Sequence, residues 1–152
     1  MSGGDALLVS ACLLGERCKY NGGSNALPPE LLAALEERYR LVPVCPERDG
    51  GMPTPRLPSE RRGERVFNAA GEDVSACFRR GAALALAAAE ENGCRRALLK
   101  ERSPSCGSGL IYDGSFRGVP IPGDGVTAEL LKRNGVAVYG ESRIPELLEQ
   151  PK

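Results

Sequence analysis

Short apolar segments alternate with amphipathic segments along the chain, and this alternation limits the possible folds more than any other feature. The apolar runs that we expect to form strands span residues 6–10, 41–44, 96–100 and 136–139. Apolar residues recur at helical spacing in the segments between them, which are residues 30–38, 73–92 and 127–133. This β-α-β-α-β-α-β order predicts a mostly parallel four-stranded sheet with helices on its faces. The expected fold class is therefore α/β, a three-layer sandwich of Rossmann-like or flavodoxin-like type.

The length and composition fit one globular domain. The chain has 152 residues, of which 41% are hydrophobic and 26% are charged, and this is ordinary usage. We therefore expect a single domain over residues 1–152. Residues 45–71 show no clean periodicity and exceed the length of most connections in compact domains. A loop of that length is usually functional or disordered, and most of its arginines are expected to be solvated.

The charge balance and the absence of histidine exclude several classes of function. Twenty basic residues balance twenty acidic ones, so no overall field draws the chain to nucleic acid or to an anionic membrane. We expect a small-molecule partner and no nucleic acid, and the sequence does not predict an oligomeric state. Because the chain has no His, Ser-His-Asp catalysis, Cys-His catalysis and imidazole-bound zinc are excluded. Chemistry must come from Cys, carboxylate, hydroxyl, Lys and Arg side chains.

The six cysteines lie far apart in a sequence typical of an ordinary α/β domain, whereas disulfide scaffolds are short, secreted and loop-rich. Residues 9–12 have the small residues of a lipoprotein-type cleavage site, but the residues before them carry an acid and no base. No apolar stretch approaches the ~20 residues of a membrane span. We therefore expect a cytoplasmic protein with reduced thiols and no membrane partner.

Three cysteines follow predicted strands. Cys12 comes two residues after the first strand, Cys45 one residue after the second and Cys106 six residues after the third. The carboxyl ends of parallel strands meet at one edge of the sheet, where ligands bind, and neighbouring strands lie ~4.8 Å apart. These three thiols can therefore meet at metal-binding distance.

The other three cysteines differ in their surroundings. Cys77 falls on the apolar stripe of the long helix and Cys94 lies at the opposite end of the sheet, so both are expected to be buried small hydrophobes. Cys18 lies in the loop after Cys12 and could reach the same site.

Thiolates without histidine favour soft metals, which are zinc, copper(I) or an iron–sulfur cluster. A structural zinc site commonly uses close pairs such as C-x-x-C, and the chain has none. Three cysteines suit a [4Fe–4S] cluster with one open iron, which can bind substrate as a Lewis acid. On spacing alone, thiols with no metal role remain an alternative.

Five motifs occur in order along the chain. They are Val9-Ser-Ala-Cys-Leu-Leu-Gly15, Cys18-Lys-Tyr-Asn-Gly22, Val44-Cys-Pro-Glu47 with Gly50-Gly51 and Pro55-Arg56, Leu99-Lys-Glu-Arg-Ser-Pro-Ser-Cys-Gly107, and Gly123-Asp-Gly-Val-Thr127. Together they resemble the thiouracil desulfurase-like family of bacterial proteins, and the resemblance spans roughly residues 6–140.

The resemblance implies an enzyme with a [4Fe–4S] cluster held by three cysteines, which match Cys12, Cys45 and Cys106. It also implies that the open iron takes the sulfur of a thiolated pyrimidine such as 2-thiouracil. The base would be hydrolysed to the oxo-base and hydrosulfide without net redox change. The acid and the hydroxyl of that chemistry match Glu47 and Ser103.

The positions of Glu47 and Ser103 in the sequence are compatible with these catalytic roles. Glu47 lies two residues after Cys45, and a carboxylate is the natural proton acceptor where no histidine exists. The alternative is a solvated loop glutamate. Ser103 is held extended by Pro104, so its hydroxyl could donate or shuttle a proton, or it could simply form a turn.

Four further residues are possible auxiliaries. Lys100 could neutralise cluster charge or orient Glu47, Ser105 could replace Ser103, and Arg56 could contact the substrate or the cluster. Cys18 supports a function of another class, a non-catalytic metal- or nucleotide-binding sensor in which it completes a closed four-cysteine site.

Overall fold

The computed structural model describes residues 5–18 and 20–149 of the chain. Four strands form one sheet in the order β2-β1-β5-β8, and all of their pairings are parallel. The strands are β1 (Ala6–Ser10), β2 (Arg40–Val44), β5 (Arg96–Leu99) and β8 (Ala137–Gly140). The predicted α/β fold with a parallel sheet is therefore confirmed.

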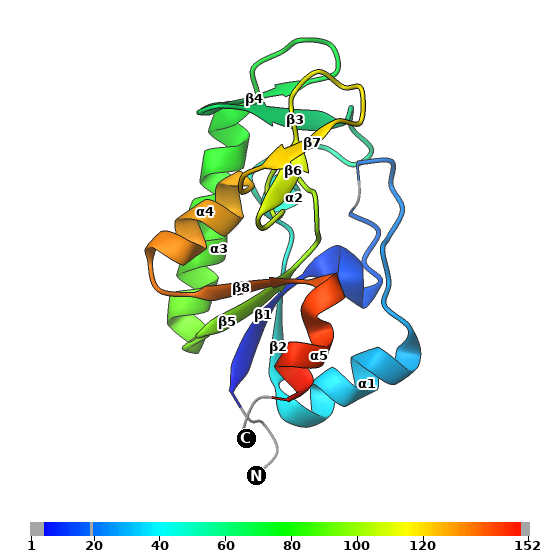
Figure 1. Ribbon diagram of the computed structural model, residues 1–152, viewed down its shortest axis with the longest axis vertical. Coiled ribbons are helices and arrows are strands. Elements are labelled where there is room, and N and C mark those ends of the chain that lie inside the picture. Colours follow the sequence, from blue (N-terminus) through cyan, green and yellow to red (C-terminus); the bar gives the residue numbers. More distant parts are fainter. Residues whose placement is uncertain (1–4, 19, 150–152) are drawn as a thin grey trace.

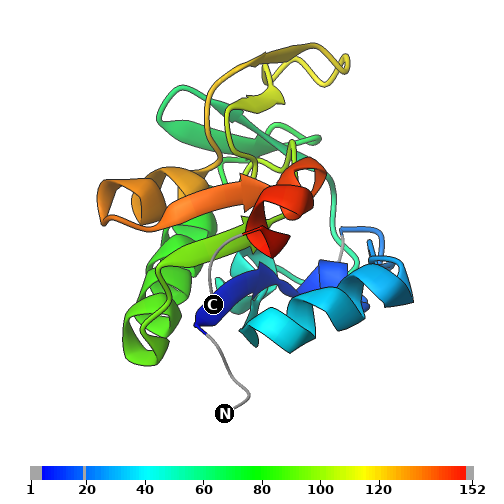
Figure 2. The same cartoon turned by 60° about the horizontal axis from the view of Figure 1, so that its bottom comes forward.

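Helices cover both faces of this sheet, as Figures 1 and 2 show. One face carries α1 (Pro29–Arg38) and α5 (Ile144–Leu148), and the other carries α3 (Ser75–Asn92) and α4 (Val126–Arg133). Short 3₁₀ helices, η1 (Ala11–Leu14) and η2 (Glu141–Arg143), follow β1 and β8 directly. The molecule is thus a three-layer sandwich, and no helix among its described residues is long and apolar enough to cross a membrane.

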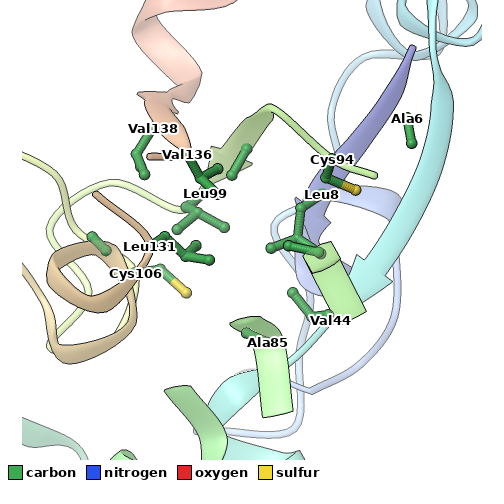
Figure 3. Packing of buried hydrophobic residues seen from close by; sticks show 13 residues of the cluster. Ala6, Leu8, Val44, Ala85, Cys94, Leu99, Cys106, Leu131, Val136 and Val138 are labelled. Atoms are coloured by element: carbon green, nitrogen blue, oxygen red, sulfur yellow. The ribbon is translucent and has the colours of Figure 1, made fainter. Parts of the chain in front are cut away.

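Alternate side chains of each central strand enter two separate cores, because successive residues of a strand point to opposite faces. Leu8 and Leu99 pack with Ala85 of α3 and Leu131 of α4 in one core (Figure 3). Leu7, Val9 and Leu98 pack with residues of α1 and α5 in the other. Burial on both faces explains why these strands are continuous apolar runs in the sequence.

Residues 45–71 are more ordered than an irregular loop. They contain α2 (Pro46–Asp49) and an antiparallel hairpin of β3 (Ser59–Arg62) and β4 (Arg65–Asn68). A second hairpin pairs β6 (Leu110–Tyr112) with β7 (Pro120–Pro122), and Figure 1 shows both hairpins at one end of the molecule. The sequence did not predict these strands because they are short and lack a regular alternation of apolar and polar residues.

The helix α2 packs directly on the backbone of α3. A Cβ atom at Gly81 would collide with the carbonyl of Pro46, and one at Gly50 would collide with the carbonyl of Cys77. Only glycine permits this approach. The contact fixes the segment that begins immediately after Cys45 and includes Glu47.

Replacing Gly81 with alanine tests this packing. We expect Gly81→Ala to lower the free energy of unfolding by about 1–3 kcal/mol, as overpacking does. This loss should occur although alanine is the better helix former by about 1 kcal/mol. Urea denaturation followed by circular dichroism measures the change. The control is Ala83→Gly at an exposed position of α3, which isolates the propensity effect. A Gly81→Ala protein as stable as the wild type would contradict the close packing.

Candidate active site

A cavity of about 690 Å³ lies at the carboxyl edge of the parallel sheet. Four of the six cysteines line it, namely Cys12, Cys18, Cys45 and Cys106. The strand order reverses between β1 and β5, which is where ligands bind in sheets of this kind. The structure therefore brings the three predicted ligands together with Cys18, at the place that the topology favours.

Different elements hold the three predicted ligands. Cys12 lies on η1, directly after β1, and its sulfur accepts a hydrogen bond from Asn25 Nδ2 at 3.5 Å. Cys45 joins β2 to α2, and its backbone N–H donates to Asp49 Oδ2 at 3.1 Å. Cys106 follows β5 on a loop, and its backbone N–H donates to Ser103 Oγ at 3.0 Å. Each of the three cysteines is thus held by a different strand end and by its own hydrogen bonds.

The loop that carries Cys106 rests on the amino-terminal end of α4. The N–H of Val126 donates to the carbonyl of Pro104 at 2.9 Å, and that of Thr127 donates to the carbonyl of Ser105 at 2.8 Å. These bonds satisfy N–H groups that have no partner within the helix itself. Gly125 allows the approach, because a Cβ there would collide with the backbone of Ser105.

Ser105 has a different position from the one expected. Its side chain is fully buried, and its hydroxyl lies 2.7 Å from Thr127 Oγ1. It is not among the residues that line the cavity. This arrangement favours a role in holding the Cys106 loop on α4 over substitution for Ser103.

Burial keeps the thiols neutral when no cation is near. Loss of solvent raises the pKa of Cys12 and raises the pKa of Cys106 to about 12, although a hydrogen bond from Ser10 opposes the shift at Cys106. Burial also raises the pKa of Cys18, and the neighbouring Cys45 thiol adds to this effect. Thiolates at these positions would need a bound metal to compensate their charge.

The arrangement of the thiols suits a cluster better than a single ion. No group of three or more His, Cys, Asp or Glu residues in the described part of the chain is placed to hold one metal ion. A zinc site would need four ligands that converge on one point. The cysteines of a four-iron cluster bind different iron atoms, so they surround a space instead. Soft thiols around a cavity, with hydrogen-bond donors to two of the sulfurs, fit a [4Fe–4S] cluster.

Glu47 lies at the wall of the same cavity and is not a solvated loop residue. Its side chain is 19% exposed, and its Oε1 lies 3.2 Å from Nε of Arg56. Burial raises the pKa of this carboxyl, while the Arg56 guanidinium acts in the opposite direction. A carboxylate that is less acidic than usual is better matched to proton transfer near neutral pH.

Ser103 and Lys100 also line the cavity. Ser103 Oγ accepts hydrogen bonds from the N–H groups of Ser105 and Cys106, so its own proton remains available for donation. Lys100 Nζ pairs with Glu141 Oε2 at 3.0 Å rather than with Glu47. Its charge lowers the pKa of Cys12 against the larger effect of burial, which agrees with a role in balancing charge at the thiols.

Several residues of the cavity were not nominated from the sequence. They include Tyr20, Asn25, Glu60, Arg102 and Tyr112. Tyr20 belongs to one of the five motifs, which is a signal that could have identified it. Tyr112 comes from a hairpin that the sequence did not predict. Cys77 and Cys94 do not line the cavity, and Figure 3 shows Cys94 well apart from Cys106 within one core.

Comparisons with known proteins agree with the fold and with the motifs. Residues 7–143 match the family model of 2-thiouracil desulfurase. The chain is 45% identical to the uncharacterized protein YbbK of Bacillus subtilis (strain 168), over 93% of this chain and 99% of that protein. It is 50% identical to a solved structure of the [4Fe-4S]-dependent thiouracil desulfidase TudS, with a TM-score of 0.90 over 94% of this chain and 95% of that one. The resemblance read from the five motifs is thereby confirmed, and the chain belongs to the 2-thiouracil desulfurase family.

Proposed function

We propose that this protein is a [4Fe–4S]-dependent desulfidase that hydrolyses a thiolated pyrimidine, 2-thiouracil or a close analogue, to the oxo-base and hydrosulfide. The observation that carries the proposal is the cavity in which cysteines from three strand ends surround a space beside Glu47. The similarity to TudS, which is described as a [4Fe-4S]-dependent thiouracil desulfidase, supports both the cofactor and the substrate class.

Cys12, Cys45 and Cys106 would hold the cluster and leave one iron without a cysteine ligand. When bound, such a cluster supplies a soft Lewis acid for the sulfur of a thiocarbonyl group. Asn25 and Ser10 would donate hydrogen bonds to the Cys12 and Cys106 sulfurs. Bonds of this kind orient metal ligands and tune their charge.

The remaining chemistry falls to side chains of the cavity wall. Glu47 accepts a proton from the attacking water, and its raised pKa suits that task. Ser103 assists this proton transfer as a relay, which passes on one proton and takes up another. Its oxygen accepts two backbone N–H groups, so its own hydrogen is free to point into the cavity. Overall, one water is consumed, the C=S bond is replaced by C=O, and the sulfur leaves as hydrosulfide. No electrons are exchanged.

The surroundings of the site suit a small substrate. A cavity of about 690 Å³ lies in the usual range for small-molecule sites. The chain has no net charge that would attract a nucleic acid. We place the protein in the cytoplasm, where thiols stay reduced.

Cys18 supports one alternative, a non-catalytic sensor with a closed four-cysteine site. It lies in the same cavity as the other three cysteines, and Cys45 Sγ is 3.8 Å from its carbonyl oxygen. A closed site would leave no position for a thio-base at the metal. Stoichiometric zinc in native protein would favour this alternative over the desulfidase, whereas a spectral change on adding 2-thiouracil would exclude it.

The direct test of the function is an anaerobic assay. Protein reconstituted with iron and sulfide is mixed with 2-thiouracil in the absence of any electron donor, and uracil and hydrosulfide are quantified. We expect the two products in a one-to-one ratio over many turnovers. A requirement for a reductant or an oxidant, or the absence of uracil, would contradict non-redox hydrolysis.

Replacement of single cysteines tests the ligand assignment. Cys12→Ser, Cys45→Ser and Cys106→Ser should each abolish the visible absorbance of the cluster after anaerobic reconstitution, because only two of its three assigned ligands would remain. Cys94→Ser is the matched control, since Cys94 is equally buried but lies outside the cavity. Full absorbance in the Cys106→Ser protein, combined with its loss in a Cys18→Ser protein, would show that the ligand set is wrong.

Replacement of Glu47 tests the base. Glu47→Gln keeps the shape and removes the basicity, so the cluster should load normally while turnover falls by roughly 10²–10⁴. Glu101→Gln is the comparison, because Glu101 also lines the cavity but already accepts a hydrogen bond from Ser142 Oγ. Turnover per cluster measures the effect. Near wild-type turnover in loaded Glu47→Gln protein, with a large loss in Glu101→Gln, would transfer the role to Glu101.

A further inference from the structure

Arg56 carries one of the most deeply buried charges in the described part of the chain. Its side chain is only 4% exposed. A buried guanidinium is tolerated only when its N–H groups find acceptors. The acceptors of the Arg56 guanidinium therefore indicate its role.

Each of its three nitrogen atoms has an acceptor. Nε donates to Glu47 Oε1 at 3.2 Å, and Nη2 donates to the carbonyl of Cys18 at 2.9 Å. Nη1 donates to the carbonyl of Pro53 and to Thr54 Oγ1 at 3.1 and 3.0 Å. With these acceptors in place, the guanidinium has no nitrogen left without a protein partner. Arg56 also lines the cavity, and its contact with the substrate or the cluster stays a prediction.

The same residue also fixes two walls of the cavity to each other. Its backbone N–H donates to the carbonyl of Tyr20 at 2.6 Å, in addition to the side-chain bond to Cys18. The loop after η1 is thereby attached to the segment that follows α2. Arg56 also forms an ion pair with the carboxylate of Glu47, which joins Glu47 to the same set of contacts.

We propose that Arg56 is a positioning residue for Glu47, which holds Oε1 in place and leaves Oε2 to accept the proton of the reacting water. The proposal rests on the proposed function of Glu47 as the base. Within the described residues, Oε1 has a hydrogen-bond donor in Arg56 and Oε2 has none. Only Nε reaches the carboxylate, and the bonds from Nη1 and Nη2 to other parts of the chain hold the planar guanidinium in place. Arg56 therefore acts through Glu47 on the rate of the chemical step.

A double-mutant cycle tests this directly. Arg56→Met should lower kcat by roughly 10- to 100-fold with little change in KM, because a misplaced base slows the chemistry without weakening substrate binding. In the Glu47→Gln background, the same substitution should change kcat by less than about 3-fold. Arg56→Lys keeps the positive charge but loses the planar guanidinium. Its kcat should therefore lie between those of Arg56→Met and the wild type. Iron and sulfide are measured in every variant, and rates are expressed per cluster.

Arg61→Met is the matched control. The side chain of Arg61 is 10% exposed, and it attaches β3 to the carbonyl of Asp124, just before α4, and to the carboxylate of Glu129 on α4. It does not line the cavity. We expect this variant to unfold at lower urea concentration while its kcat stays within about 2-fold of the wild-type value.

Two outcomes would overturn the proposal. If the fold-decrease in kcat of the double variant equals the product of the decreases in Arg56→Met and Glu47→Gln, Arg56 does not act through Glu47. A rise in KM at constant kcat would show that it binds substrate instead. If Arg56→Met protein does not retain its cluster, the cycle is run with Arg56→Lys, and multiplying effects there are equally decisive. A wild-type protein that releases no hydrosulfide, or an unaffected Glu47→Gln protein, would instead refute the proposed function on which this inference rests.

Discussion

The parallel pairing of β1 with both β2 and β5 is the constraint on which the site depends. This pairing places the carboxyl ends of three strands side by side, at the point where the strand order reverses. Cys12, Cys45 and Cys106 follow those three ends and line one cavity, although the first and last are separated by most of the chain. The apolar residues of the strands thus determine, through the sheet that they form, where these three cysteines meet.

Burial changes the pKa values of the ionisable side chains in the cavity. It raises the pKa values of Cys12 and Cys106, and a nearby cation would oppose this shift. It also raises the pKa of Glu47, and Arg56 limits that rise. Close backbone contacts support both functional segments, since Gly81 admits α2 against α3 and Gly125 admits the Cys106 loop against α4. The positions of Glu47 and of Cys106 are therefore set by these backbone contacts.

The sequence predicted the parts of this structure that leave a local signal. The central strands are apolar runs because both faces are buried, and the three cysteines could be placed at one edge by counting from the ends of the strands. The pairings of Arg56 with Glu47, Lys100 with Glu141 and Ser105 with Thr127 could not be predicted, because they join elements that no local periodicity relates. The two hairpins were missed for a similar reason, since β7 consists of Pro120, Ile121 and Pro122 and gives no alternation.

The iron and acid-labile sulfide content of protein purified without oxygen is the most direct test of a cluster in this cavity. If three cysteines at the strand ends hold a cluster, native protein should contain about four iron and four sulfide per chain. Zinc should be absent from such a preparation. One zinc per chain, or a colourless protein that takes up neither iron nor sulfide on anaerobic reconstitution, would contradict the assignment of this cavity as an iron–sulfur site.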